Sequence, residues 1–165
     1  MPDFSIRSTS VKGNFELVQE DKTSLYVVEY KNWYSGEATS NFDGNSYVIR
    51  SANFWQSQFE VLRNDVFIGK FSFNWKGEII ITYRNTNGIE NEMLFQYKGI
   101  WKLRFILSDR SGNELLAMAS SWSNLKYHYD VSVADGLFPE NEMKELLMIC
   151  GYSANLYMTT MMGVF

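Results

Sequence analysis

The sequence predicts a mainly β protein: an antiparallel barrel of about 10 to 12 strands that encloses a hydrophobic C-terminal α-helix. Three observations predict this fold class. Aromatic residues make up 16% of the 165 residues, with 2 prolines and 11 glycines, which favours strands over helical bundles. Short runs of alternating apolar and polar residues follow one another from about residue 4 to residue 133. A long segment without charged residues then ends the chain.

Alternation with a period of two is clearest between Phe67 and Trp75. In an extended strand, Phe67, Phe71, Phe73 and Trp75 would share one face with Gly69. The other face would carry Ile68, Lys70, Ser72 and Asn74. This is the pattern of a half-buried strand. Similar runs lie at 58–62, 79–84, 102–107 and 126–133.

Turn signals separate these runs. The strongest is Asn87-Gly88, because both central positions of a type I′ turn need positive φ. Weaker signals lie at 43–45, 64–65, 76–77, 98–99 and 109–113. Turns at this spacing predict consecutive antiparallel hairpins, since a parallel crossover needs a dozen or more residues. No linker or low-complexity tract divides the chain, so we expect one domain over 1–165.

The C-terminal segment is predicted to be a helix over about 139–163. Pro139 suits the first helical turn, and Glu140 and Glu142 lie near the positive end of the helix dipole. Apolar residues then recur every three or four positions: Met143, Leu146, Leu147, Cys150, Ala154, Tyr157 and Met161. From Leu146 onward no charged face exists, so this helix must be surrounded by protein or by lipid.

Burial inside the barrel is the first interpretation of this helix, and a tail anchor inserted in lipid is the alternative. Residues 146–165 are long enough to span a membrane. However, Gly151, Ser153 and Asn155 interrupt the apolar run, and no cluster of Lys or Arg flanks it. Barrels of about eleven strands can hold a central helix. A lumen filled in this way leaves the outer surface and the rims for binding.

Composition excludes several functions. A net charge of -4 and a sequence pI near 5.0 argue against nucleic-acid binding, which needs a basic surface. One cysteine excludes an internal disulfide, and one histidine removes multi-histidine metal sites. We expect no metal, no cofactor and no enzymatic activity. Residues 1–10 contain no apolar run, so a cytoplasmic location is expected.

Two segments carry a resemblance to a known group of proteins. One is the strand–turn–strand module FEVLRNDVFIGKFSFNW (59–75), partly echoed by FILSDRSGNELLAMASSW (105–122) with a D-x-x-G hairpin pattern. The other is the apolar segment 145–165. Together, over about the last two thirds of the chain, they resemble the tubby-like superfamily. That superfamily includes the tubby C-terminal domain, the phospholipid scramblases and the LURP-one-related proteins.

The resemblance implies a barrel around a central helix, and it implies lipid or protein binding without identifying a ligand. Tubby-type members bind phosphoinositides through a basic surface pocket, and scramblases are associated with membranes. No residue of this chain aligns with that pocket, so none is carried over. The chain also lacks the proline-rich and cysteine-rich segments of scramblases.

The residues themselves suggest one binding surface. Basic side chains interleave with an aromatic one in YKGIWKLRF, and two further basic residues lie on other predicted strands with outward parity; the candidates are Arg84, Lys98, Trp101, Lys102, Arg104 and Lys126. A basic–aromatic surface of this kind docks on anionic head groups. We therefore expect a binding or scaffold domain that recognises an anionic membrane surface, peripherally, or another protein.

Other chemistry-bearing residues have simpler explanations. His128 would share the polar face of a strand with Asp130, but no matching nucleophile motif is present. Cys150 lies among apolar neighbours that cannot activate a thiol. Glu90 and Glu92 would point to one strand face near a hairpin, where carboxylates commonly face water.

Overall fold

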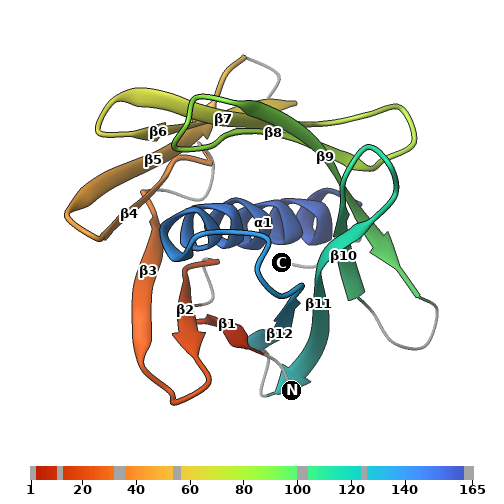
Figure 1. The fold of residues 1–165 in the computed structure, drawn as a ribbon. Helices are drawn as coiled ribbons and strands as arrows, with labels where there is room; N and C mark the ends of the chain where they lie inside the picture. Colours follow the sequence, from red (N-terminus) through yellow and green to blue (C-terminus); the bar gives the residue numbers. More distant parts are fainter. Residues whose placement is uncertain are drawn as a thin grey trace.

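The computed structural model describes residues 3–10, 13–31, 36–53, 57–99, 104–123 and 126–161. These residues form twelve strands followed by one helix (Figure 1). The elements are β1 (Phe4–Ser8), β2 (Phe15–Gln19), β3 (Ser24–Tyr30), β4 (Ala38–Phe42), β5 (Asn45–Ser51), β6 (Gln58–Arg63), β7 (Val66–Phe73), β8 (Ile79–Arg84), β9 (Glu90–Lys98), β10 (Arg104–Ser108), β11 (Glu114–Ser123), β12 (Lys126–Val133) and α1 (Glu140–Met161).

The strands close into one antiparallel barrel. Each strand pairs with its neighbours in the sequence, and β1 pairs with β12 to close the ring. This up-and-down order follows from the short hairpins, which return the chain directly beside the preceding strand. Closure removes the exposed sheet edges that an open sheet would leave. The predicted fold class is confirmed.

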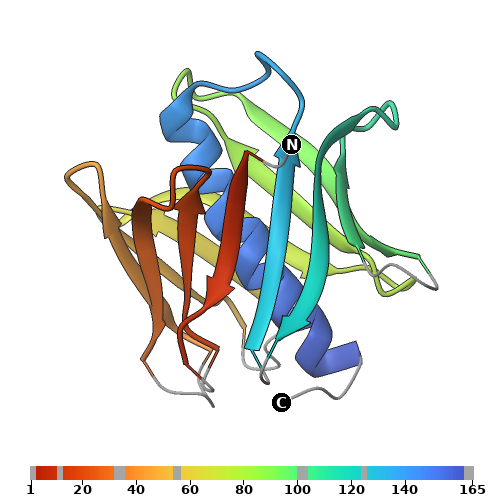
Figure 2. The ribbon, with the colours of Figure 1, turned by 90° about the horizontal axis from the view of Figure 1, so that it is seen from below.

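The helix α1 runs through the lumen of this barrel (Figure 1). It begins just beyond the end of β12 and crosses diagonally behind β1, β12 and β11 (Figure 2). We call the end of the barrel where α1 begins the proximal rim; it carries the connections 20–23, 43–44, 64–65, 85–89, 109–113 and 134–139. The opposite end, where α1 finishes, is the distal rim.

The start of α1 differs by one position from the expectation. The carbonyl of Pro139 accepts the first helical hydrogen bond, from the Met143 N–H at 2.9 Å. Pro139 is therefore the N-cap residue and not the first helical residue. The last predicted helical residues, 162–163, lie outside the described part of the chain.

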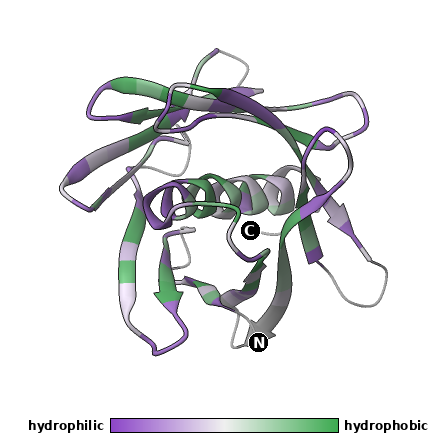
Figure 3. Ribbon diagram, viewed as in Figure 1, coloured by the Kyte–Doolittle hydropathy of each residue, from purple (hydrophilic) through white to green (hydrophobic). Residues whose placement is uncertain are grey.

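The helix is buried on all sides along its central part. Residues from Leu146 to Cys150 are each at most 1% exposed, whichever direction they point. Tyr152 packs against Phe59 and Phe71 at ring-centroid distances of 5.5 and 5.4 Å. In Figure 3 the middle of α1 is coloured hydrophobic and its first turn hydrophilic, and hydrophilic residues also gather in the connecting hairpins. The absence of a charged face beyond Leu146 is thus explained by enclosure in protein.

Two of the residues that interrupt the apolar run of α1, Gly151 and Asn155, serve this enclosure. At Gly151, an added Cβ would lie 2.8 Å from the Phe15 ring, so glycine lets the helix approach β2 closely. The Asn155 side-chain amide donates to the carbonyl of Gly13 at 3.1 Å and bonds the Tyr127 hydroxyl at 2.5 Å. These polar groups tie the end of α1 to the distal rim.

The prediction that Phe67 and Trp75 share one strand face with Phe71 is wrong for both residues. The β6–β7 register places Val61 opposite Gly69 and Leu62 opposite Phe67, so Ile68 is an extra residue that forms a β-bulge. The bulge turns Phe67 to the outer face, whereas Gly69 and Phe71 stay inside. Trp75 lies beyond the end of β7, in the turn before β8, and is 89% exposed.

Turn types also differ from the prediction. In the hairpin of Asn87-Gly88 only Gly88 has positive φ (78°), and the loop closes between Asn85 and Ile89. The hairpin is therefore longer than a two-residue type I′ turn. In contrast, Asn64 and Asp65 both have positive φ, at 49° and 67°, as a two-residue type I′ turn requires.

Candidate functional site

A buried ionic cluster holds the start of α1. Glu145 is 1% exposed and projects from the first turns of the helix into the barrel wall. Its carboxylate accepts hydrogen bonds from the hydroxyls of Tyr47 at 2.7 Å and Tyr83 at 2.6 Å, and it pairs with the Arg63 guanidinium at 2.7 Å. Three strands (β5, β6 and β8) thereby converge on one helical residue.

Sequence reasoning did not find this cluster, because an acid near the start of a helix, such as Glu145, is already explained by the helix dipole. Burial, together with the hydrogen bond to Glu145, raises the pKa of Tyr83, so this hydroxyl keeps its proton and donates. The same two causes raise the pKa of Tyr47. Because both carboxylate oxygens are bonded to the barrel wall, the cluster fixes the depth of α1 and is a structural element of the barrel.

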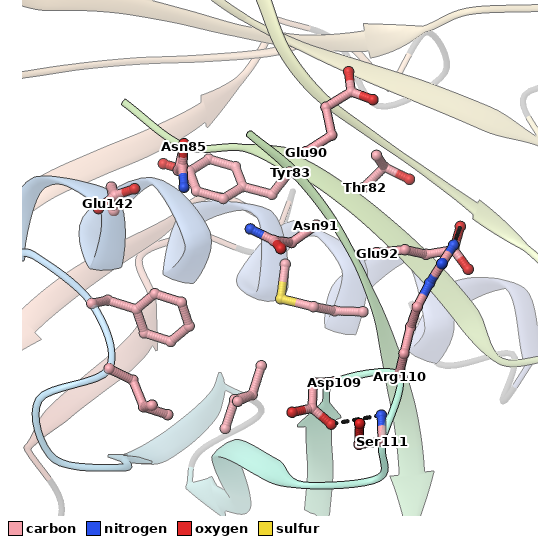
Figure 4. A pocket seen from close by; sticks show the side chains of 14 residues that line it. Thr82, Tyr83, Asn85, Glu90, Asn91, Glu92, Asp109, Arg110, Ser111 and Glu142 are labelled. Carbon is pink, nitrogen blue, oxygen red and sulfur yellow. Dashed lines mark hydrogen bonds and ion pairs between the residues drawn. The ribbon is translucent and has the colours of Figure 1, made fainter. Parts of the chain in front are cut away.

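A pocket of about 610 Å³ lies at the proximal rim, next to this cluster. It forms because β10 is shorter than β9: the last β9–β10 pair is Leu94 with Ser108, so residues 90–93 extend past β10. The β10–β11 hairpin and the segment before α1 surround the space left open, which we call the rim pocket (Figure 4). Its lining residues are Thr82, Tyr83, Asn85, Glu90, Asn91, Glu92, Met93, Asp109, Arg110, Ser111, Leu115, Leu137, Phe138 and Glu142.

Carboxylates dominate the charge of the rim pocket. Glu92 pairs with Arg110 at 3.3 Å, and Glu90 pairs with Arg84 at 2.8 Å. Asp109 accepts hydrogen bonds from Asn113, through its side chain and backbone N–H, and from the Ser111 N–H.

The hydrogen bonds from Asn113 and Ser111 hold the pKa of Asp109 below its usual range, so it is an anion at neutral pH. Glu142 is 6% exposed and accepts from the Thr86 N–H at 3.3 Å. Neither Asp109 nor Glu142 forms an ion pair with a cation among the described residues.

The structure places the residues of the candidate basic surface at both ends of the barrel. Lys98 and Arg104 are opposite each other in the β9–β10 pair, and both are exposed at the distal rim. Lys126 begins β12 at the same rim. Arg84 lies at the proximal rim instead, paired with Glu90, with its guanidinium 5.4 Å from the Phe67 ring. Trp101 and Lys102 lie outside the described residues.

Sequence reasoning missed a second aromatic–basic pair at the distal rim. Trp75, in the β7–β8 turn, is 89% exposed, and the Lys76 ammonium lies 5.2 Å from the centre of its ring. Hydrogen bonds from Asn74 and Gln96, with smaller contributions from Lys76 and Lys98, lower the pKa of Glu78. Lys76 and Lys98 therefore both lie near Glu78. The signal was available, because Lys76-Gly77 already marked a turn that ends the strand before Trp75.

The two rims differ in charge. Acidic residues outnumber basic ones at the proximal rim, where the described acids include Glu20, Asp21, Asp43, Asp65, Glu90, Asp109, Asp135 and Glu140. At the distal rim the described charges are nearly balanced, with Arg7, Lys31, Lys76, Lys98 and Arg104 against Glu16, Glu29, Glu37 and Glu78. The overall charge of -4 is therefore unevenly distributed.

His128 and Asp130 do form a pair on β12, at 2.7 Å. The Ser5 hydroxyl approaches the same Asp130 oxygen at 3.5 Å. In a nucleophile–base–acid triad the imidazole must contact the hydroxyl, whereas here the carboxylate lies between them. The arrangement does not activate Ser5.

The residues that the structure describes contain no group of three or more His, Cys, Asp or Glu side chains that could hold a metal ion. Among the same residues, no helix combines the length and apolar character needed to cross a membrane. Cys150 is fully buried in α1, and burial raises the pKa of its thiol.

Comparison with known proteins returns no relative: no family model, no curated protein and no solved structure matches this chain. The tubby-like resemblance therefore rests on the sequence pattern alone. What is established for this chain is its architecture, a closed twelve-stranded antiparallel barrel with α1 in its lumen.

Proposed function

We propose that this protein is a non-enzymatic binding domain that docks its distal rim on an anionic membrane surface. The observation that carries the proposal is Trp75, a tryptophan 89% exposed at the tip of a turn with Lys76 beside its ring. Tryptophan partitions to the membrane interface because its ring is amphipathic. An exposed tryptophan flanked by lysine suits insertion between anionic head groups.

Lys98 and Arg104 support the same surface. They are cross-strand neighbours with exposed side chains, and like charges placed opposite each other destabilise a sheet. An anionic surface would relieve that repulsion. Lys126 begins a strand at the same rim, and the sequence between Lys98 and Arg104 adds Trp101 and Lys102 as further candidates.

The negative net charge does not oppose this docking mode. The nine residues of β9 run from one rim to the other, and the eight steps between them, at roughly 3.3 Å each, give the strand a length of about 26 Å. The Debye length at physiological ionic strength is about 8 Å, so the acidic proximal rim is screened from a membrane at the distal rim. A membrane docked there would therefore interact mainly with the charges of the distal rim.

Vesicle flotation tests the proposal. The full chain should float with vesicles of phosphatidylcholine and 30% phosphatidylserine at low salt, and flotation should fall at 0.5 M salt. Reversing two charges, in Lys98→Glu with Arg104→Glu, should lower the partition coefficient by about 30-fold or more, at about 1 kcal/mol for each basic residue. Trp75→Ser should weaken binding at both salt concentrations, since it removes an apolar contribution.

The matched control is Lys22→Glu with Lys70→Glu, which changes the net charge equally at exposed sites away from the distal rim. This control should float like the original chain. Equal flotation with pure phosphatidylcholine, or equal loss in both double variants, would contradict recognition of anionic head groups by the distal rim. No flotation of the original chain would contradict membrane docking and would favour a protein partner for the same surface.

A further inference from the structure

We propose that the rim pocket binds a linear aliphatic diamine, with one ammonium group at Glu142 and the other at Asp109. This site lies at the opposite rim from the proposed membrane surface and does not depend on it. Its volume of about 610 Å³ lies within the range of 300 to 1,000 Å³ typical of small-molecule sites.

Glu142 provides the buried anion. Its side chain is 6% exposed, and one carboxylate oxygen accepts a single hydrogen bond from the Thr86 N–H at 3.3 Å. The positive end of the α1 dipole offsets part of its charge. No cation among the described residues forms an ion pair that would neutralise the rest of the Glu142 charge. A buried carboxylate in this state favours a cationic ligand, because desolvated charges need a partner.

Asp109 provides the second anion, on the other side of the pocket. Figure 4 shows Glu142 on α1 and Asp109 on the β10–β11 hairpin, facing the space from different walls. The hydrogen bonds from Asn113 and Ser111 fix the Asp109 carboxylate in place. Two separated, fixed anions match a ligand with two separated positive charges.

The remaining charges of the pocket are already neutralised. Glu92 and Glu90 pair with Arg110 and Arg84, so they have little need for a ligand cation. Besides the charged residues, the lining is mixed. Apolar side chains come from Met93, Leu115, Leu137 and Phe138, and uncharged polar ones come from Thr82, Tyr83, Asn85, Asn91 and Ser111. The apolar side chains can pack against methylene groups, whereas the two unpaired carboxylates attract ammonium groups. A short alkyl chain with an ammonium group at each end combines these features.

Titration calorimetry on the full chain, at fixed ionic strength, tests the inference. The probes are 1,5-diaminopentane and, as the monocation with the same carbon chain, pentylamine. The diamine should bind at least tenfold more tightly than pentylamine and should raise the temperature of unfolding. Asp109→Asn and Glu142→Gln, which keep the hydrogen-bonding shape, should each weaken diamine binding at least tenfold.

Glu114→Gln is the control, because Glu114 is an exposed acid at the same rim outside the pocket lining. It should leave diamine affinity within about twofold. Equal affinity for diamine and pentylamine would overturn the inference, as would an equal loss in Glu114→Gln. Absence of binding heat and of any thermal shift at millimolar diamine would overturn it as well. Circular dichroism of each variant checks that the barrel is intact.

Discussion

A chain that ends at Glu142 is expected not to fold. Removing residues 143–165 takes away most of α1 and exposes the wall that surrounds it. The deleted side chains include six large apolar groups at most 4% exposed: Leu146, Leu147, Met148, Ile149, Tyr152 and Met158. Each contributes about 1.5–3 kcal/mol by burial, so their sum matches or exceeds a typical stability of about 5–15 kcal/mol.

Urea unfolding, followed by near-UV circular dichroism, measures this effect. The truncated chain should show no cooperative transition and no near-UV signal, because the inward-facing side chains of the strands lose the helix against which they pack. A chain that ends at Met161 retains all of α1 and is the matched control; it should unfold cooperatively. A cooperative transition in the truncated chain, at a urea midpoint close to that of the control, would show that the barrel folds stably without the helix.

Replacing Glu145 with leucine is expected to cost about 3 kcal/mol of folding stability. Breaking a buried ion pair by removing one partner typically costs about 3–5 kcal/mol, because the other charge stays buried. The lower value applies here, since the Arg63 side chain is 29% exposed and keeps some contact with water. The hydroxyls of Tyr47 and Tyr83 also lose their acceptor.

The comparison variant is Glu140→Leu, on the same helix. Its side chain is 78% exposed and pairs weakly with Lys144 at 3.5 Å, so its stability should change by less than about 0.5 kcal/mol. Adding Arg63→Met to Glu145→Leu should recover part of the lost stability, because no unpaired charge then remains. Equal urea midpoints for Glu145→Leu and Glu140→Leu would contradict the role of the cluster.

Periodicity was sufficient to predict the barrel because nearly every strand has one face on a continuous core. Tyr127, Tyr129 and Val131, which alternate with polar residues, are all at most 3% exposed. The enclosed helix was predictable for the same kind of reason, since a segment without a polar face needs a partner on every side. Both features are local patterns in the sequence.

Features that depend on contacts between distant residues were not predictable. The bulge at Ile68 turns the Phe67 side chain to the outer face. It arises from the pairing of β6 with β7 and not from the alternation within β7. Glu145 pairs with Arg63, which lies 82 residues earlier in the chain, and no local sequence pattern links the two. The rim pocket depends on the difference in length between β9 and β10.

The predicted basic surface shows the same limit. Parity along a strand correctly indicates which side chains point outward, but it does not say at which rim they lie. Arg84 and Lys98 both point outward, yet the β8–β9 register places them at opposite ends of the barrel. Trp75 was assigned to a buried face because the strand was extended two residues too far.

The reactivity of Cys150 tests the enclosed helix most directly. This residue is the single cysteine of the chain, it lies in the middle of α1, and it is 0% exposed. With a disulfide reagent such as Ellman's, the native protein should react at least about a thousandfold more slowly than the chain unfolded in urea, because the thiol becomes accessible only through unfolding. Reaction of the native protein at the rate of the unfolded chain would show that α1 lies outside the barrel.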